Sequence, residues 1–227
     1  MSSIYLVRHA QSHANVDNLV LRKNTNIGID LTDIGREQIL EAGKFLSTHF
    51  LNKEPVPLNL MTHLTPKIKV WNSPYDRTRK TAQAIKDELV ANGLQYVEEE
   101  NIHIAERQLG IIDEHEDYEN SYPAEFNHYQ LHRTAKQEFF VRPPLGESAF
   151  DMCLRLDFFL KNYLEREPQY EHIVVTHGAC VRGLIMLLTK DTYESYNEMS
   201  NPHNASIHYI ENHKNKGLIF EPNNITG

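Results

Sequence analysis

Two short apolar segments, far apart in the chain, each lead into a histidine and then a small residue. Ile4-Tyr5-Leu6-Val7 runs into Arg8-His9-Ala10, and Ile173-Val174-Val175 runs into Thr176-His177-Gly178. Short runs of β-branched and other apolar residues are typical of buried strands. A small residue after each strand allows a turn, a helix N-terminus and a closely bound ligand. This repeated pattern restricts the fold most, because it requires two buried strands whose carboxyl ends carry histidines.

The remaining chain alternates strand and helix patterns, which predicts an α/β three-layer sandwich with a mostly parallel central sheet and helices on both faces. The predicted strands are Ile4–Val7, Ile68–Trp71, His172–Thr176 and a final hairpin of Ser206–Ile210 and Leu218–Phe220 with a Lys-Asn-Lys-Gly turn. The predicted helices begin at a Thr32 cap, at Ser73-Pro74, at Ser148 and at Ala179, and 52–65 reads as a loop. No repeat or linker is visible, so we expect one domain over residues 1–227.

The segment from about Ile111 to Gly146 differs from its surroundings because its periodicity is weak. Five carboxylates lie within residues 113–119, and aromatic residues follow at Tyr122, Phe126, Tyr129, Phe139 and Phe140. Two interpretations stay open: an insertion that covers a site as a lid, or a solvated loop followed by a helix.

The net charge and the cysteine content restrict the expected partners and the expected location of the protein. The chain has 31 acidic and 23 basic residues, a net charge of −8 with histidine counted as neutral. Nucleic acids and anionic membranes require a basic surface, so we expect neither as a partner. No secretory signal or membrane span is apparent, and Cys153 and Cys180 are too few for a disulfide framework. We therefore expect a cytoplasmic protein, and whether it forms a homo-oligomer stays open.

A third predicted strand end carries an arginine. Val70-Trp71-Asn72 leads into Ser73 and then Arg77, which falls in the first turn of the predicted helix. A cation there is opposed by the helix dipole by a few tenths to ~1 kcal/mol. Either an anion lies in front of Arg77, or Arg77 is a surface residue paired with Asp76 or Glu88.

Six short motifs in sequence order resemble the histidine phosphatase superfamily, also called the phosphoglycerate mutase-like family. They are Leu6 to Ser12 with its Arg8-His9, Leu31-Thr32-Asp33-Ile34-Gly35, Ser73 to Ala82, Glu106-Arg107-Gln108-Leu109-Gly110, Gly146-Glu147-Ser148 and Thr176-His177-Gly178. The resemblance covers nearly the whole chain and implies a phosphoglycerate mutase-like fold.

The resemblance also implies roles for individual residues. His9 matches the nucleophile that becomes phosphohistidine, and Glu106 matches the general acid and base, although Glu114 and Glu147 remain alternatives. Arg8, Arg77 and His177 match the residues around the transferred phosphoryl oxygens. Further candidates for binding the substrate are Asn15, Gly178, Asn204 and Arg142.

Hydrolysis and mutase-type transfer both fit this set of residues. The mutase branch has a tyrosine three positions after the acid, where this chain has Leu109, and it places adjacent arginines in the insertion, whereas Arg133 and Arg142 are spread out here. The acidic residues at 113–119 would also repel a small polyanion if they faced the site. We therefore predict a phosphatase for a small phosphorylated substrate, with a mutase as the alternative, and expect Arg142 and the aromatic residues of the insertion to select the substrate.

Two other possibilities are weaker. His9 and His13, and also His128 and His132, are four residues apart, a spacing that suits a metal on a helix. No His-Glu-x-x-His string accompanies them, so we expect neither a metal nor a cofactor. A non-catalytic module that binds a phosphorylated ligand is disfavoured because both histidines, both arginines and the acid are present.

Overall fold

A mixed six-stranded sheet lies at the centre of the computed structural model, which describes residues 3–17, 19–23, 25–53, 67–114, 117–133 and 139–223. The strands are β1 (Ser3–Arg8), β2 (Ile68–Asn72), β3 (Tyr96–Glu100), β4 (Glu171–Thr176), β5 (Ile207–Glu211) and β6 (Lys214–Phe220). Their order is β3-β2-β4-β1-β5-β6. The first four strands pair in parallel, and β5 and β6 are antiparallel to their neighbours. The predicted fold class is confirmed.

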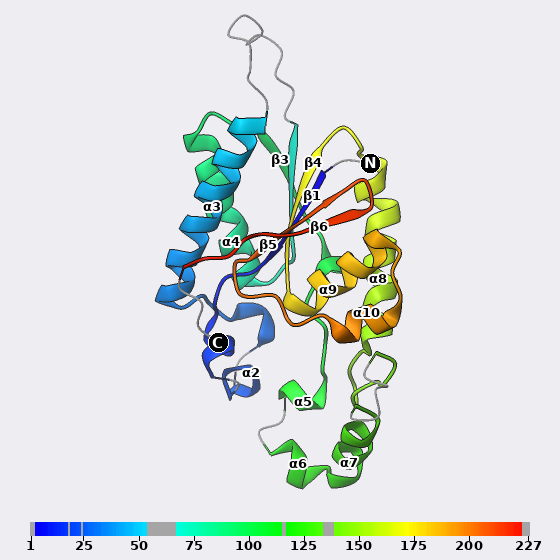
Figure 1. Ribbon diagram of the computed structural model, residues 1–227. Helices are drawn as coiled ribbons and strands as arrows, with labels where there is room; N and C mark the ends of the chain where they lie inside the picture. Colours follow the sequence, from blue (N-terminus) through cyan, green and yellow to red (C-terminus); the bar gives the residue numbers. More distant parts are fainter. Residues whose placement is uncertain are drawn as a thin grey trace, which may run out of the picture.

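Helices cover both faces of the sheet (Figure 1). The helices are α1 (His13–Val16), α2 (Leu19–Lys23), α3 (Asp33–Lys53), α4 (Asp76–Ala91), α5 (Ile111–Glu114), α6 (Tyr118–Ser121), α7 (Pro123–His132), α8 (Ala149–Asn162), α9 (Gly178–Thr189) and α10 (Tyr193–Glu198). Side chains of β1 alternate between the faces: Tyr5 and Val7 pack with α3 and α4, and Ile4 and Leu6 pack with α8 and α9. The two cores therefore hold β1 in place from both sides.

Parallel pairing of β1 with β4 brings the two histidines together. The register aligns Arg8 with Thr176, and the ladder continues as the backbone N–H of His9 donates to the Thr176 carbonyl at 2.8 Å. His9 and His177 therefore follow the carboxyl ends of adjacent strands, and their ring centroids lie 5.2 Å apart. Ligands of open α/β sheets bind at this edge.

One sequence prediction about local structure was wrong, and one strand was missed. The turn of the final hairpin is Asn212-His213, where both residues have positive φ, and the predicted Lys-Asn-Lys-Gly turn is part of β6. A two-residue turn with both φ values positive matches the twist of the strands, whereas Gly217, with φ of 90°, lies beside an irregularity in the β5–β6 register. The edge strand β3 was not predicted, because its Tyr-Val-Glu-Glu-Glu sequence is polar and half exposed.

The predicted caps gave mixed results. Thr32 caps α3 as expected, since its Oγ1 accepts a 3.0 Å hydrogen bond from Gly35 N–H, and Ser148 caps α8 with a capping box. Ser73 does not cap α4, which begins at Asp76 after Tyr75. The Ser73 hydroxyl lies instead 2.8 Å from His177 Nε2, so the site uses it.

The segment 111–146 contains three short helices, α5, α6 and α7. In Figure 1 the parallel strands run downward, and these helices lie below the carboxyl ends of the strands. Residues 115–116 and 134–138 of this segment lie outside the described residues, as does most of the loop predicted at 52–65. Among the described helices, none combines the length and the apolar character that crossing a membrane requires.

Gly35 is required because α3 packs directly against the loop that follows His9. A Cβ at this position would lie 2.1 Å from the backbone oxygen of Gln11. We expect Gly35→Ala to lower the free energy of unfolding by about 1–3 kcal/mol, as overpacking does, and to reduce activity by moving the loop. Denaturant titration measures the first effect. Gly28→Ala is the control, since its Cβ would approach Thr25 Oγ1 no closer than 3.4 Å; equal stability of the two variants would contradict the prediction.

Candidate active site

The His9 ring presents one nitrogen to the site. Its Nδ1 lies 2.8 Å from the backbone oxygen of Ala10. A carbonyl only accepts, so Nδ1 carries the proton and donates, and Nε2 keeps its lone pair. Burial, followed by the positive charge of Arg77, holds the pKa of His9 well below its ordinary value. His9 is therefore a neutral imidazole with a free nucleophilic nitrogen.

The two predicted arginines lie beside His9 and are buried. Arg8 ends β1, and its Nη1 donates to the Pro202 carbonyl. Arg77, in the first turn of α4, donates from Nη1 to the Asn26 carbonyl at 2.8 Å. Asp76 pairs with Arg79 instead of Arg77, so the surface-pair interpretation of Arg77 is wrong. Buried guanidinium groups at this edge create a local positive field that favours an anion.

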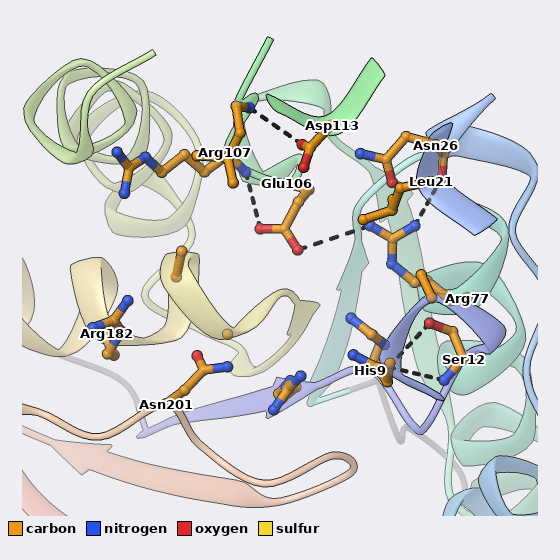
Figure 2. Close-up of a pocket in the computed structure, with 16 residues that line it drawn as sticks. His9, Ser12, Leu21, Asn26, Arg77, Glu106, Arg107, Asp113, Arg182 and Asn201 are labelled. Atoms are coloured by element: carbon orange, nitrogen blue, oxygen red, sulfur yellow. Dashed lines mark hydrogen bonds and ion pairs between the residues drawn. The ribbon is translucent and has the colours of Figure 1, made fainter. Parts of the chain in front are cut away.

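Glu106 places a carboxylate between a second histidine and Arg77. Its Oε2 is 3.2 Å from His177 Nδ1 and 3.8 Å from Arg77 Nη2, and Figure 2 shows the carboxylate reaching toward the Arg77 guanidinium. Burial alone would raise the pKa of Glu106, but His177 and Arg77 hold it well below its ordinary value. Burial lowers the pKa of His177 to about 4. The site thus holds an ionised carboxylate and two neutral histidines.

These residues surround one pocket of about 410 Å³. Its lining includes Arg8, His9, Ser12, Ala14, Asn15, Leu21, Asn26, Arg77, Glu106, Arg107, Leu109, Asp113, Gly178, Ala179, Arg182 and Asn201. Figure 2 labels several of them, among them His9, Arg77 and Glu106. A pocket that joins a neutral histidine, buried arginines and a carboxylate at the ends of parallel strands suits transfer of an anionic group.

A family model for the histidine phosphatase superfamily (branch 1) matches residues 4–225 of the chain. The chain belongs to this superfamily. A phosphoglycerate mutase-like protein of Arabidopsis thaliana is 29% identical over 223 residues, 92% of this chain, and the chain spans 64% of that relative. A 2,3-bisphosphoglycerate-dependent phosphoglycerate mutase of Allorhizobium ampelinum is 27% identical over 85% of this chain and 82% of that protein.

Solved structures of phosphatases share the fold. A mycobacterial glucosyl-3-phosphoglycerate phosphatase superposes with a TM-score of 0.64 at 19% identity, over 98% of this chain and 99% of that chain. An alpha-ribazole phosphatase of Shigella flexneri gives a TM-score of 0.65 at 18% identity, over 99% and 98% of the two chains. These structures share the arrangement of the sheet and helices with this chain. The reaction must be inferred from the residues of the chain itself.

The four further residues predicted to bind the substrate differ in their position relative to the pocket. Asn15 and Gly178 line the pocket. Asn204 lies behind it, where its Nδ2 donates to the His9 carbonyl at 3.0 Å and to Asn15 Oδ1 at 3.2 Å. Arg142 is not brought into the pocket, since it lies exposed in an ion pair with Asp151 at 2.5 Å. Asn204 therefore supports the site from behind, and Arg142 stands apart from it.

The aromatic residues expected to select the substrate also lie elsewhere in the part of the chain that the structure describes. Phe139 belongs to the core under α8, and Phe126 and Tyr122 pack around Tyr118. From the insertion, Asp113 reaches the pocket lining. Glu147 pairs with Arg155, whereas a carboxylate oxygen of Glu106 lies within 4.8 Å of ring nitrogens of His9 and His177.

Sequence reasoning missed two cations, Arg107 and Arg182, in the pocket lining. Arg107 is buried and donates from Nε to the Glu147 carbonyl, and Arg182 packs its guanidinium over the Tyr196 ring at 4.5 Å. Neither makes an ion pair within the described residues. The only signal in the sequence was position: Arg107 follows the acid, and Arg182 lies one turn into the helix after His177.

One group of donors in the described ranges has metal-binding geometry: nitrogen and oxygen atoms of His9, Glu106 and His177 lie within 4.8 Å of one another. The expected pair of His128 and His132 lies on α7 with ring centroids 4.4 Å apart and belongs to no group of three donors there. A cation at His9 would face Arg8 and Arg77, which oppose it. The residues fit an anion better than a metal.

The pKa of His9 gives a direct prediction. Because the folded protein holds this pKa well below 6.5, the ring stays unprotonated as the pH falls through 6.5. In ¹⁵N-edited NMR, we expect His9 to remain the neutral Nδ1–H tautomer at pH 6, with the signal assigned by its loss in His9→Gln. A His9 imidazolium at pH 6.5 would contradict this description of the site.

Proposed function

We propose that the protein is a phosphatase that hydrolyses a small phosphomonoester through a phosphohistidine on His9, with Glu106 as general acid and base. The observation that carries the proposal is the free Nε2 of a neutral, buried His9 at the centre of a pocket lined by Arg8, Arg77 and Glu106. The residues supply nucleophile, positive charge and acid themselves, so the proposal includes no cofactor. The two cysteines are buried and unpaired, which supports a cytoplasmic location.

The reaction takes two steps. His9 Nε2 attacks phosphorus, the bond to the ester oxygen breaks, and Glu106 gives a proton to the departing alcohol. Water then attacks the phosphohistidine, Glu106 takes its proton, and inorganic phosphate leaves His9. Arg8 and Arg77 stabilise the phosphoryl oxygens, where negative charge accumulates. His177, held by the Ser73 hydroxyl, completes this environment beside His9.

Glu106 must carry a proton in the first step, although its neighbours favour the ionised carboxylate. A bound phosphate ester would pair with the Arg77 guanidinium, which would then stabilise the Glu106 carboxylate less. The ester would also add negative charge beside the carboxylate. Both effects raise the pKa of Glu106. A monoanionic ester also brings the required proton with it.

Two pocket residues support hydrolysis. Leu109 lines the pocket at the position where the mutase branch has a tyrosine, and it offers no hydroxyl to a substrate. Asp113 adds a negative charge to the same wall. Both make the pocket less suited to hold a polyanion through isomerisation.

Mutase-type transfer is the second candidate, and Arg107 and Arg182 favour it. They line the pocket in addition to Arg8 and Arg77, and the charge of Arg182 acts on the pKa of Arg8. Two further guanidinium groups would hold a second anionic group of a substrate such as a phosphoglycerate.

A metal-free panel of sugar phosphates, nucleotides, glycerol 3-phosphate and 3-phosphoglycerate tests the proposal. We expect phosphate release from at least one phosphomonoester to exceed any isomerisation of 3-phosphoglycerate. Comparison of 3-phosphoglycerate with glycerol 3-phosphate isolates the effect of the carboxylate. If isomerisation of 3-phosphoglycerate is faster than its hydrolysis, the protein is a mutase and the proposed phosphatase activity is wrong.

The acid assignment predicts a dependence on the leaving group. A positioned acid contributes ~10²–10⁴ in rate, and a 4-nitrophenolate leaves without a proton. We expect Glu106→Gln to lose about this factor in kcat/KM for an alkyl phosphate and far less for 4-nitrophenyl phosphate. Steady-state kinetics with both substrates measure it, and equal losses would argue against Glu106 as the acid.

A further inference from the structure

The segment that carries Glu106 is held by side chains. The carbonyl oxygens of four consecutive residues each accept a hydrogen bond: Arg155 Nη1 donates to His103 at 2.7 Å, Thr176 Oγ1 to Ile104 at 2.7 Å, Cys180 Sγ to Ala105 at 3.0 Å, and Arg155 Nη2 to Glu106 at 3.2 Å. The Gln108 side chain also donates to the Glu106 carbonyl, at 3.1 Å. The donors of the first four hydrogen bonds come from β4, α8 and α9.

Arg155 makes the first and the last of these four contacts. One guanidinium group thus spans the segment from His103 to Glu106 and fixes both ends. The planar fork of arginine suits this task, since its donors have a fixed geometry. Thr176 and Cys180 bind the two carbonyls between these ends, so the backbone that leads into Glu106 has little freedom to rotate.

Glu147 fixes Arg155 in turn. Arg155 Nε lies 3.0 and 3.2 Å from the two oxygens of Glu147, and Nη2 lies 2.9 Å from Oε2. Both side chains are about four-fifths buried. Glu147 also donates its backbone N–H to the Gln108 carbonyl at 2.8 Å, so it joins the two ends of the 111–146 segment directly behind the acid.

We propose that Arg155, oriented by Glu147, is a positioning residue that holds the Glu106 carboxylate at the leaving oxygen of the substrate. This inference rests on the proposed role of Glu106 as general acid. Arg155 is not among the residues of the described chain that line the pocket, so it acts through the backbone of residues 103–106. Proton transfer needs heavy atoms within hydrogen-bond reach, and a small displacement of the acid costs much of its effect.

The test compares two substrates in the full chain: 4-nitrophenyl phosphate and an alkyl phosphate that the panel identifies as hydrolysed. Arg155→Lys keeps the charge but offers one point donor where the fork spans two carbonyls. We expect it to lower kcat/KM for the alkyl phosphate by about 10- to 100-fold, part of the contribution of a positioned acid, and for 4-nitrophenyl phosphate by about threefold at most. Glu147→Gln should give the same selective loss to a smaller degree.

Arg142→Met is the matched control, because Arg142 also pairs with a carboxylate of α8, Asp151, and lies outside the pocket. It should leave both substrates unchanged. Cys180→Ala removes the thiol that donates to the Ala105 carbonyl, and it serves as the test if the Arg155 variants do not fold. It should lower kcat/KM for the alkyl phosphate more than kcat/KM for 4-nitrophenyl phosphate.

The outcomes separate the two proposals. Equal losses for both substrates, or no loss, in folded Arg155→Lys would overturn the positioning role. If Glu106→Gln itself shows no dependence on the leaving group, the acid assignment fails whatever Arg155 does. A selective loss in Glu106→Gln with none in Arg155→Lys would leave the acid in place and reject only its positioning by Arg155.

Discussion

The parallel pairing of β1 with β4 is the interaction on which the site depends. The hydrogen bond from His9 N–H to the Thr176 carbonyl continues the ladder by one residue past β1, so two histidines distant in sequence follow adjacent strand ends. A slip of one residue would turn every side chain of β1 to the opposite face. The two cores on either side of the sheet prevent it, because Tyr5 and Val7 fit one and Ile4 and Leu6 the other.

Local electrostatics then give the site its chemistry, against the charge of the whole chain. The chain as a whole carries a net charge of −8. Yet Arg8, Arg77, Arg107 and Arg182 line one pocket that contains only Glu106 and Asp113 as carboxylates within the described residues. Burial, with the charges of Arg77 and Arg8, lowers the pKa of His9 and keeps its ring neutral. In the proposed reaction, the same neighbouring charges would bind the phosphoryl group and keep the attacking nitrogen of His9 unprotonated.

The sequence predicted what local patterns encode. His9, His177 and Arg77 follow apolar strands. Because the carboxyl ends of parallel strands lie at one edge of a sheet, their meeting there could be inferred from the sequence. Arg155 and Arg182 could not be found this way. The sequence pattern predicts that a charged residue on a helix is exposed, and only tertiary contacts show that it is not. Ser73 read as a cap since its local pattern matched one, but its hydroxyl binds His177 across the sheet. Similarly, Gly217 suggested a turn that Asn212-His213 makes instead.

The central claim is that His9 becomes covalently phosphorylated, and trapping this intermediate tests it most directly. The protein is mixed with excess 4-nitrophenyl phosphate, quenched in alkaline denaturant within the first turnover, digested and analysed by mass spectrometry. We expect an acid-labile phosphoryl group on the peptide that contains His9, and none in His9→Ala, which should also lack turnover. A His9→Ala protein that hydrolyses the substrate at the wild-type rate, or a phosphoryl group on a different residue, would contradict the account.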